Sequence, residues 1–140
     1  MTFDPVEIVR TLSAHGVRYA VVGGFALAAQ GVVRATEDLD VVTDRGLENA
    51  ERLAEALAAI DGRASEPLDA ETLHLLRAVS GIPTYRDLDR EVVEIDGVEF
   101  DVSTRAALKE MKRAAGRDKD LIDLAELEAL EEGDDAQARS

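Results

Sequence analysis

The stretch Tyr19–Asp44 reads YAVVGGFALAAQGVVRATEDLDVVTD and decides how the rest of the chain is interpreted. Residues 19–22 are aromatic or aliphatic and are followed at once by Gly23-Gly24, which predicts a strand that ends in a tight turn. Residues 25–30 are rich in Ala and Leu, so they predict a short helix that ends at Gly31. A strand, glycine and helix in this order direct backbone N–H groups toward a phosphate-sized ligand.

The second half of the stretch contains Asp38-Leu39-Asp40 at the start of another apolar segment. Residues i and i+2 of a strand project from the same face, so we expect the two carboxylates to point the same way. Neighbouring carboxylates repel each other unless a cation lies between them, and their hard oxygens suit Mg²⁺ that carries substrate phosphates. Either motif alone also occurs in purely structural roles, but their order and spacing are more specific than either part.

In these motifs the chain resembles the nucleotidyltransferase superfamily, which has the fold of polymerase β. The family signature is a glycine turn, a helix and an Asp-hydrophobic-Asp strand, here Gly23-Gly24 and Asp38-Leu39-Asp40. Residues 34–37 and 112–124 also match segments of small bacterial relatives, among them abortive-infection toxins and lincosamide-type resistance enzymes. The resemblance implies an α/β (α+β) domain with a mixed β-sheet flanked by helices, covering residues 17–130.

The resemblance also implies roles for individual residues. Two acidic residues would hold Mg²⁺ and act in catalysis, Asp38 and Asp40. Lys112 would join them as a catalytic residue that neutralises phosphate charge. The expected nucleotide-binding residues are Gly23, Gly24, Arg34, Arg117, Lys119 and Asp120. An alternative interpretation of the charged residues near the C-terminus is a surface ion-pair network.

Relatives place a third carboxylate on a further strand, where it binds metal or takes a proton from the acceptor. In this sequence we expect Thr84 at that position, with Asp87 and Asp89 close by. Asp101, on the predicted strand 98–102, is another candidate. If none of them substitutes, the resemblance implies slow turnover or a relative that only binds.

The remaining elements follow from local patterns. Asp4-Pro5 predicts a helix start, residues 47–60 an amphipathic helix, and residues 71–79 a helix or a strand. Asp96-Gly97 between two alternating segments predicts a β-hairpin. Helices are expected from Thr104 and again after Gly116. We predict one domain over residues 1–132 and a flexible acidic tail over 133–140.

The composition restricts the classes of partner. The formal net charge of 140 residues is -14, so no broad nucleic-acid-binding surface is evident. The chain has no Cys, which excludes disulfides and thiolate metal sites. No apolar run is long enough for a membrane helix, so we expect a cytoplasmic protein without a membrane partner.

Together these patterns predict a transferase that moves a nucleoside monophosphate from an NTP, such as ATP, to an unknown acceptor hydroxyl with Mg²⁺. The acceptor could be RNA, protein or a small molecule. The alternative is a catalytically weakened component of a toxin–antitoxin pair that binds a partner protein, with the third carboxylate missing. An antibiotic-modifying enzyme is a further possibility, although such enzymes usually need a larger acceptor pocket.

Overall fold

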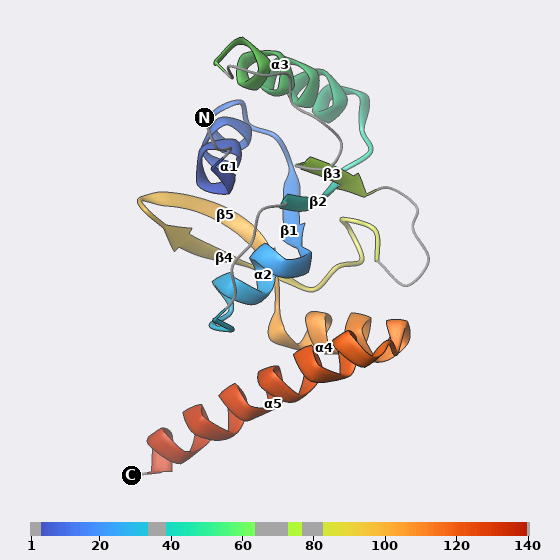
Figure 1. Cartoon of the computed structure of the whole chain (residues 1–140). Coiled ribbons are helices and arrows are strands. Elements are labelled where there is room, and N and C mark those ends of the chain that lie inside the picture. Colours follow the sequence, from blue (N-terminus) through green and yellow to red (C-terminus); the bar gives the residue numbers. More distant parts are fainter. Residues whose placement is uncertain (1–3, 34–38, 64–72, 77–82, 140) are drawn as a thin grey trace.

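The computed structural model of the chain describes residues 4–33, 39–63, 73–76 and 83–139, and for 61–63, 73–76 and 138–139 only the backbone (Figure 1). Within these residues the helices are α1 (Pro5–Ala14), α2 (Gly23–Ala29), α3 (Leu47–Arg63), α4 (Arg105–Ala115) and α5 (Asp118–Arg139). The strands are β1 (Tyr19–Val22), β2 (Leu39–Thr43), β3 (Leu73–Leu76), β4 (Arg90–Ile95) and β5 (Val98–Ser103).

The strands form one mixed sheet in the order β3-β2-β1-β5-β4. β1 lies at its centre, antiparallel to β2 and parallel to β5. β2 pairs with β3 in parallel, and β4 pairs with β5 as an antiparallel hairpin. The mixed α/β class expected from the sequence is therefore confirmed.

The two faces of the sheet are covered differently. On one face, Val21, Val41 and Val102 belong to the main core, which includes apolar residues of α1 and α3. The opposite face has a smaller cluster in which Ala20 and Val22 join residues of α4 and of the segment 83–89. Alternation along each strand separates the two sets, because successive side chains point to opposite faces.

The helix caps and the turns adopt the conformations that their residue types predict. The Asp4 side chain accepts a hydrogen bond from the Val6 N–H at the start of α1, and Thr104 caps α4 in the same way. The hairpin turn has positive φ at both Asp96 and Gly97, which matches the twist of the flanking strands. Gly116 ends α4 at φ 62°, in the left-handed region.

Two stretches refine the predictions. The segment left open between helix and strand contains strand β3. At the other end, α5 continues past the predicted domain end at residue 132 and reaches Arg139. The ion pair between Arg105 Nη1 and Asp134 Oδ2, 2.7 Å apart, holds the first turn beyond that boundary against α4. Figure 1 shows α4 and α5 packed together and away from α1 and α3, although Leu108 of α4 and Leu127 of α5 also belong to the main core.

None of the helices among the described residues is long and apolar enough to cross a membrane.

Candidate functional site

The turn between β1 and α2 is built around Gly23. This residue has φ +71°, a conformation that side-chain-bearing residues rarely adopt, and it is the first residue of α2. A Cβ added at Gly23 would overlap the carboxylate of Asp40. Glycine is therefore required twice at this position, once for the backbone angle and once for the close approach of an acidic group.

Asp40 reaches this turn because of the register of the sheet. Its backbone partner on β1 is Val22, the residue immediately before Gly23. Asp40 is only partly buried, whereas Leu39 and Val41 on either side of it are fully buried on the opposite face. The structure thus brings Asp40 and Gly23 together, and we call this pair the Gly23–Asp40 junction. Gly24 follows as the second residue of α2 and is also partly buried.

Two residues predicted for the same site, Arg34 and Asp38, lie outside the described residues. The expected pairing of two carboxylates therefore stays a prediction. Within the part of the chain that the structure describes, no three His, Cys, Asp or Glu residues gather as a metal cluster. Mg²⁺ often uses only one or two protein carboxylates and completes its shell with water and substrate phosphates, so the hard oxygens of Asp40 fit it as one ligand.

The candidates for a third carboxylate occupy separate places. Thr84 lies on a turn and its hydroxyl donates to Asp87 Oδ2 at 3.1 Å, so the strand position expected for it is wrong. Asp89 Oδ2 accepts from the Thr104 hydroxyl at 2.7 Å, which ties this segment to the start of α4. These two acids therefore anchor a loop, and neither lies on a strand beside Asp40.

Asp101 lies on the same face of the sheet as Asp40 but is separated from it by β1. Asp101 pairs with Ala20 of β1, and Asp40 pairs with Val22 of β1. The Cα atoms of Asp101 and Asp40 are therefore two strand spacings apart across the sheet and two residues apart along it, a distance of roughly 12 Å. Asp101 Oδ2 is also engaged by Arg90 Nε at 3.5 Å and by the Tyr85 hydroxyl at 3.4 Å. The guanidinium of Arg90 stacks over the Tyr85 ring at 4.0 Å, so Asp101 anchors this aromatic contact.

The residue that directly neighbours Asp40 on the far strand is His74, through the parallel pairing of β2 with β3. No motif in the sequence marks His74. The apolar run Leu73–Leu76, interrupted by one polar residue, was the available signal for a strand, but only the register shows which residue adjoins Asp40.

The charged residues near the C-terminus form a second group, the α4–α5 ion-pair cluster of Lys112, Arg117, Asp120 and Asp123. Lys112 Nζ lies 2.9 Å from Asp123 Oδ2 and 3.4 Å from Asp120 Oδ1. Arg117 Nε donates to Asp120 Oδ2 at 2.6 Å, and the Arg117 backbone N–H donates to the same oxygen at 3.2 Å. Both carboxylates are almost fully buried, at 1% and 2% exposure.

The hydrogen bonds in this cluster favour the charged form of the Asp120 carboxylate. Donation from Arg117 is the main reason that the pKa of Asp120 is lowered from 3.8 to about 2, with Lys112 adding to the effect. The same partner raises the pKa of the exposed Arg117 guanidinium. Lys119 is exposed and makes no ion pair with any described residue, so it does not belong to the cluster.

The predicted site residues thus fall into two groups. Gly23, Gly24 and Asp40 meet at the β1–α2 turn, while Lys112, Arg117 and Asp120 meet between α4 and α5. The interpretation of the second group as an ion-pair network describes its contacts, with the difference that its carboxylates are buried. No family model matches the sequence of this chain, and no curated protein matches it.

Proposed function

We propose that this protein is a Mg²⁺-dependent nucleotidyltransferase that uses the Gly23–Asp40 junction to hold an NTP. The observation that carries the proposal is the approach of the Asp40 carboxylate to a glycine whose φ is +71°. An acidic group held against a glycine turn, at the end of the central strand, is a suitable place for a cation that carries phosphates. The order of strand β1, the glycine turn, helix α2 and strand β2 with Asp40 also supports the proposal.

In this proposal Asp40 and Asp38 would hold Mg²⁺, which when bound would offset the negative charge of the triphosphate. Gly23 and Gly24 would allow the triphosphate to approach the backbone closely because they carry no side chain. The acceptor hydroxyl oxygen would form a bond to the α-phosphorus as the bond to the bridging oxygen breaks. Pyrophosphate would leave with the electron pair, and the hydroxyl proton would pass to solvent or to a nearby base.

The roles of the basic residues follow from their present partners. Lys112 is bound to two buried carboxylates, so we propose that it positions α5 against α4 and does not contact phosphate directly. Arg117 has a side chain that is 61% exposed although its Nε is bonded to Asp120, and Lys119 is exposed as well. These two remain the candidates for contact with a nucleotide.

The direct test is to titrate Mg²⁺ with each of the four NTPs into the wild-type protein and into Asp40→Asn. The amide keeps the size of the side chain but removes its charge, so we expect at least tenfold weaker binding, about 1.4 kcal/mol or more. Asp135→Asn is the matched control, because Asp135 is an exposed acid on the distal part of α5. Equal affinity of wild type and Asp40→Asn for every Mg²⁺–NTP would refute the proposal.

A second candidate function is a nucleotide- or partner-binding component that does not turn over. The observation that favours it is that the Asp101 carboxylate contacts Arg90 and Tyr85. Asp101 therefore does not act as a third carboxylate next to Asp40. A transfer assay with α-labelled NTPs and mixed RNA, protein and small-molecule acceptors distinguishes the two. Label transfer would exclude the binding-only function, whereas nucleotide binding or a co-purifying partner without transfer would support it.

A further inference from the structure

The C-terminal end of α2 is bound by a side chain of α4. The guanidinium of Arg105 donates two hydrogen bonds to the backbone carbonyl of Gln30, from Nε at 3.1 Å and from Nη2 at 2.9 Å. Gln30 is the C-cap residue of α2, so its carbonyl lies where the helix itself supplies no donor. A cation at this end also interacts favourably with the helix dipole, so Arg105 caps α2 from outside the helix.

The same guanidinium reaches the distal part of α5. Arg105 Nη1 lies 2.7 Å from Asp134 Oδ2, beyond residue 132 of that helix. Arg105 is therefore bonded to Gln30 of α2 on one side and to Asp134 of α5 on the other. Because the guanidinium is a rigid plane, the positions of its two partners are linked. We call Gln30, Arg105 and Asp134 the α2–α5 clasp.

The side chain of Gln30 joins the clasp to the sheet. Gln30 is buried, and its Nε2 donates to the Ser103 carbonyl at 2.9 Å and to Glu91 Oε1 at 2.7 Å. Gln30 is thus held through its backbone by α4 and through its side chain by β4 and β5. The clasp therefore fixes the position of the end of α2 as well as capping it.

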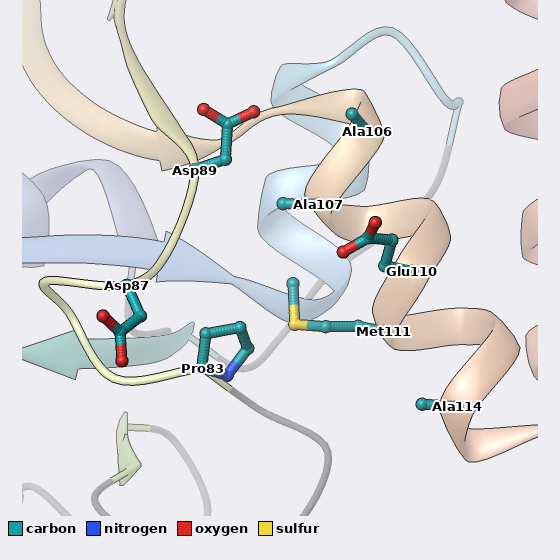
Figure 2. A pocket seen from close by; sticks show the side chains of 8 residues that line it. All are labelled: Pro83, Asp87, Asp89, Ala106, Ala107, Glu110, Met111 and Ala114. Carbon is teal, nitrogen blue, oxygen red and sulfur yellow. The ribbon is translucent and has the colours of Figure 1, made fainter.

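The start of α4 is itself anchored, so Arg105 extends from a fixed point. The Thr104 hydroxyl donates to Asp89 Oδ2 at 2.7 Å, and the Thr104 backbone N–H donates to the Asp89 carbonyl at 3.1 Å. Figure 2 shows Asp89 near the point where the chain enters α4, with the other residues that line a cavity of about 440 Å³ between α4 and the segment 83–89.

The short helix α2 connects the clasp with the Gly23–Asp40 junction. The helix has seven residues and begins at Gly23, so the clasp and the junction lie at its two ends. Its length is roughly 10 Å. Residues 25–27 are buried in the core, which keeps α2 against the sheet. Since the Asp40 carboxylate leaves no room for a Cβ on Gly23, a change in the tilt of α2 would alter the junction.

We propose that Arg105 is a positioning residue for the Gly23–Asp40 junction. By binding α2 to α5 it fixes the tilt of α2, and with it the place of the glycine turn beside Asp40. The effect on nucleotide affinity rests on the proposed nucleotidyltransferase function, whereas the effect on the conformation of the turn does not. The extension of α5 beyond residue 132 thereby takes part in shaping the site.

Lys109 offers a matched control on the same pair of helices. Its Nζ lies 2.8 Å from Glu131 Oε2, so Lys109→Met also breaks an ion pair that joins α4 to α5. That ion pair does not include α2. If Arg105 only held α4 and α5 together, Arg105→Met and Lys109→Met would have the same effect on the glycine turn.

The first experiment measures the turn itself, without nucleotide or Mg²⁺. We would label glycine with ¹⁵N and record the amide resonances of the variants. We expect Arg105→Met to shift the Gly23 and Gly24 resonances, Asp134→Asn to shift them less, and Lys109→Met to leave them in place. Asp134→Asn alters an exposed residue, so it keeps the test available should Arg105→Met not fold. Unshifted Gly23 and Gly24 resonances in both clasp variants, or equal shifts in Lys109→Met, would overturn the proposal.

Titration with Mg²⁺–ATP then distinguishes this proposal from the proposed function. We expect Arg105→Met to bind the nucleotide about threefold more weakly than the wild type, Lys109→Met to bind it equally well, and Arg105→Lys to recover part of the loss because it keeps the charge. Shifted glycine resonances without nucleotide binding by the wild type would count against the proposed function alone. Equal nucleotide binding by the wild type and Arg105→Met would count against the positioning role alone.

Discussion

The Gly23–Asp40 junction and the α4–α5 ion-pair cluster both contain acidic residues that the sequence marks as functional, yet they have opposite environments. Asp40 is partly exposed and lies against backbone at a glycine. Asp120 and Asp123 are buried and are bound by Lys112. The buried carboxylates take part in packing α5 against α4, whereas the carboxylate of Asp40 remains partly accessible to solvent.

The difference shows that acidic residues of similar motifs can lie in a buried ion-pair network in one place and partly exposed at a turn in another, where we propose a ligand site. A change in the cluster should act first on folding, because removing one partner of a buried ion pair leaves an uncompensated charge. A change in the junction should act on ligand affinity and on the conformation of one turn. The following predictions test this division, from the largest expected effect to the smallest.

Lys112→Met should reduce the free energy of unfolding by about 3 kcal/mol, because it leaves Asp123 and Asp120 buried without the Lys112 ammonium. Urea denaturation at neutral pH measures this loss. Lys119→Met is the matched control and should change stability by less than about 0.5 kcal/mol, since Lys119 is an exposed surface residue. A stable Lys112→Met protein with weakened Mg²⁺–NTP binding would contradict the division and place Lys112 in the nucleotide site.

Gly23→Ala should reduce the free energy of unfolding by about 2 kcal/mol, through its positive φ and the overlap of the new Cβ with Asp40. Gly97→Ala is an informative control, because Gly97 has φ +78° but no heavy atom within 4 Å of an added Cβ. The difference between the two losses measures the crowding at Asp40. This difference should shrink when Asp40→Ala is added, and an unchanged difference would show that Asp40 does not restrict Gly23.

Asp120 should make stability depend on acid pH. Its pKa in the folded protein is lowered from 3.8 to about 2, so as the pH falls the unfolded chain takes up the proton first. The stabilisation is therefore complete above about pH 5 and is lost as the pH falls from there toward 2. Denaturation midpoints measured across this window should fall for the wild type and fall less for Asp120→Asn. Parallel pH profiles of the two proteins would be evidence against the ion pairing of Asp120.

Much of the secondary structure could be predicted because its signals are local. The Asp4-Pro5 helix start, the Asp96-Gly97 hairpin and the Thr104 helix cap each act within a few residues, and all three occur in the structure. Residues 71–79 contain no such cap or turn signal, so their sequence is compatible with either a helix or a strand. The prediction that Thr84 lies on a strand was wrong. No signal near Thr84 in the sequence specifies which strand adjoins β2.

The candidate site was predicted in part. The sequence indicated both Gly23 and Asp40, which the structure brings into contact. It also predicted Lys112 as a catalytic residue, and the structure shows the contacts of its ammonium group with Asp120 and Asp123. Spacing along the chain shows which residues can share a helix face or a strand face. It does not show which of two facing helices will bury a charged group.

The sequence by itself determined most of the elements, their order and the glycine that the β1–α2 turn requires, because propensity, capping and alternation act over short distances along the chain. Only the tertiary structure decided that His74 lies beside Asp40 and that Asp101 is engaged by Arg90. It also decided that Arg105 joins the end of α2 to the distal part of α5. These features depend on sheet register and on packing between segments distant in the chain, which no local pattern encodes.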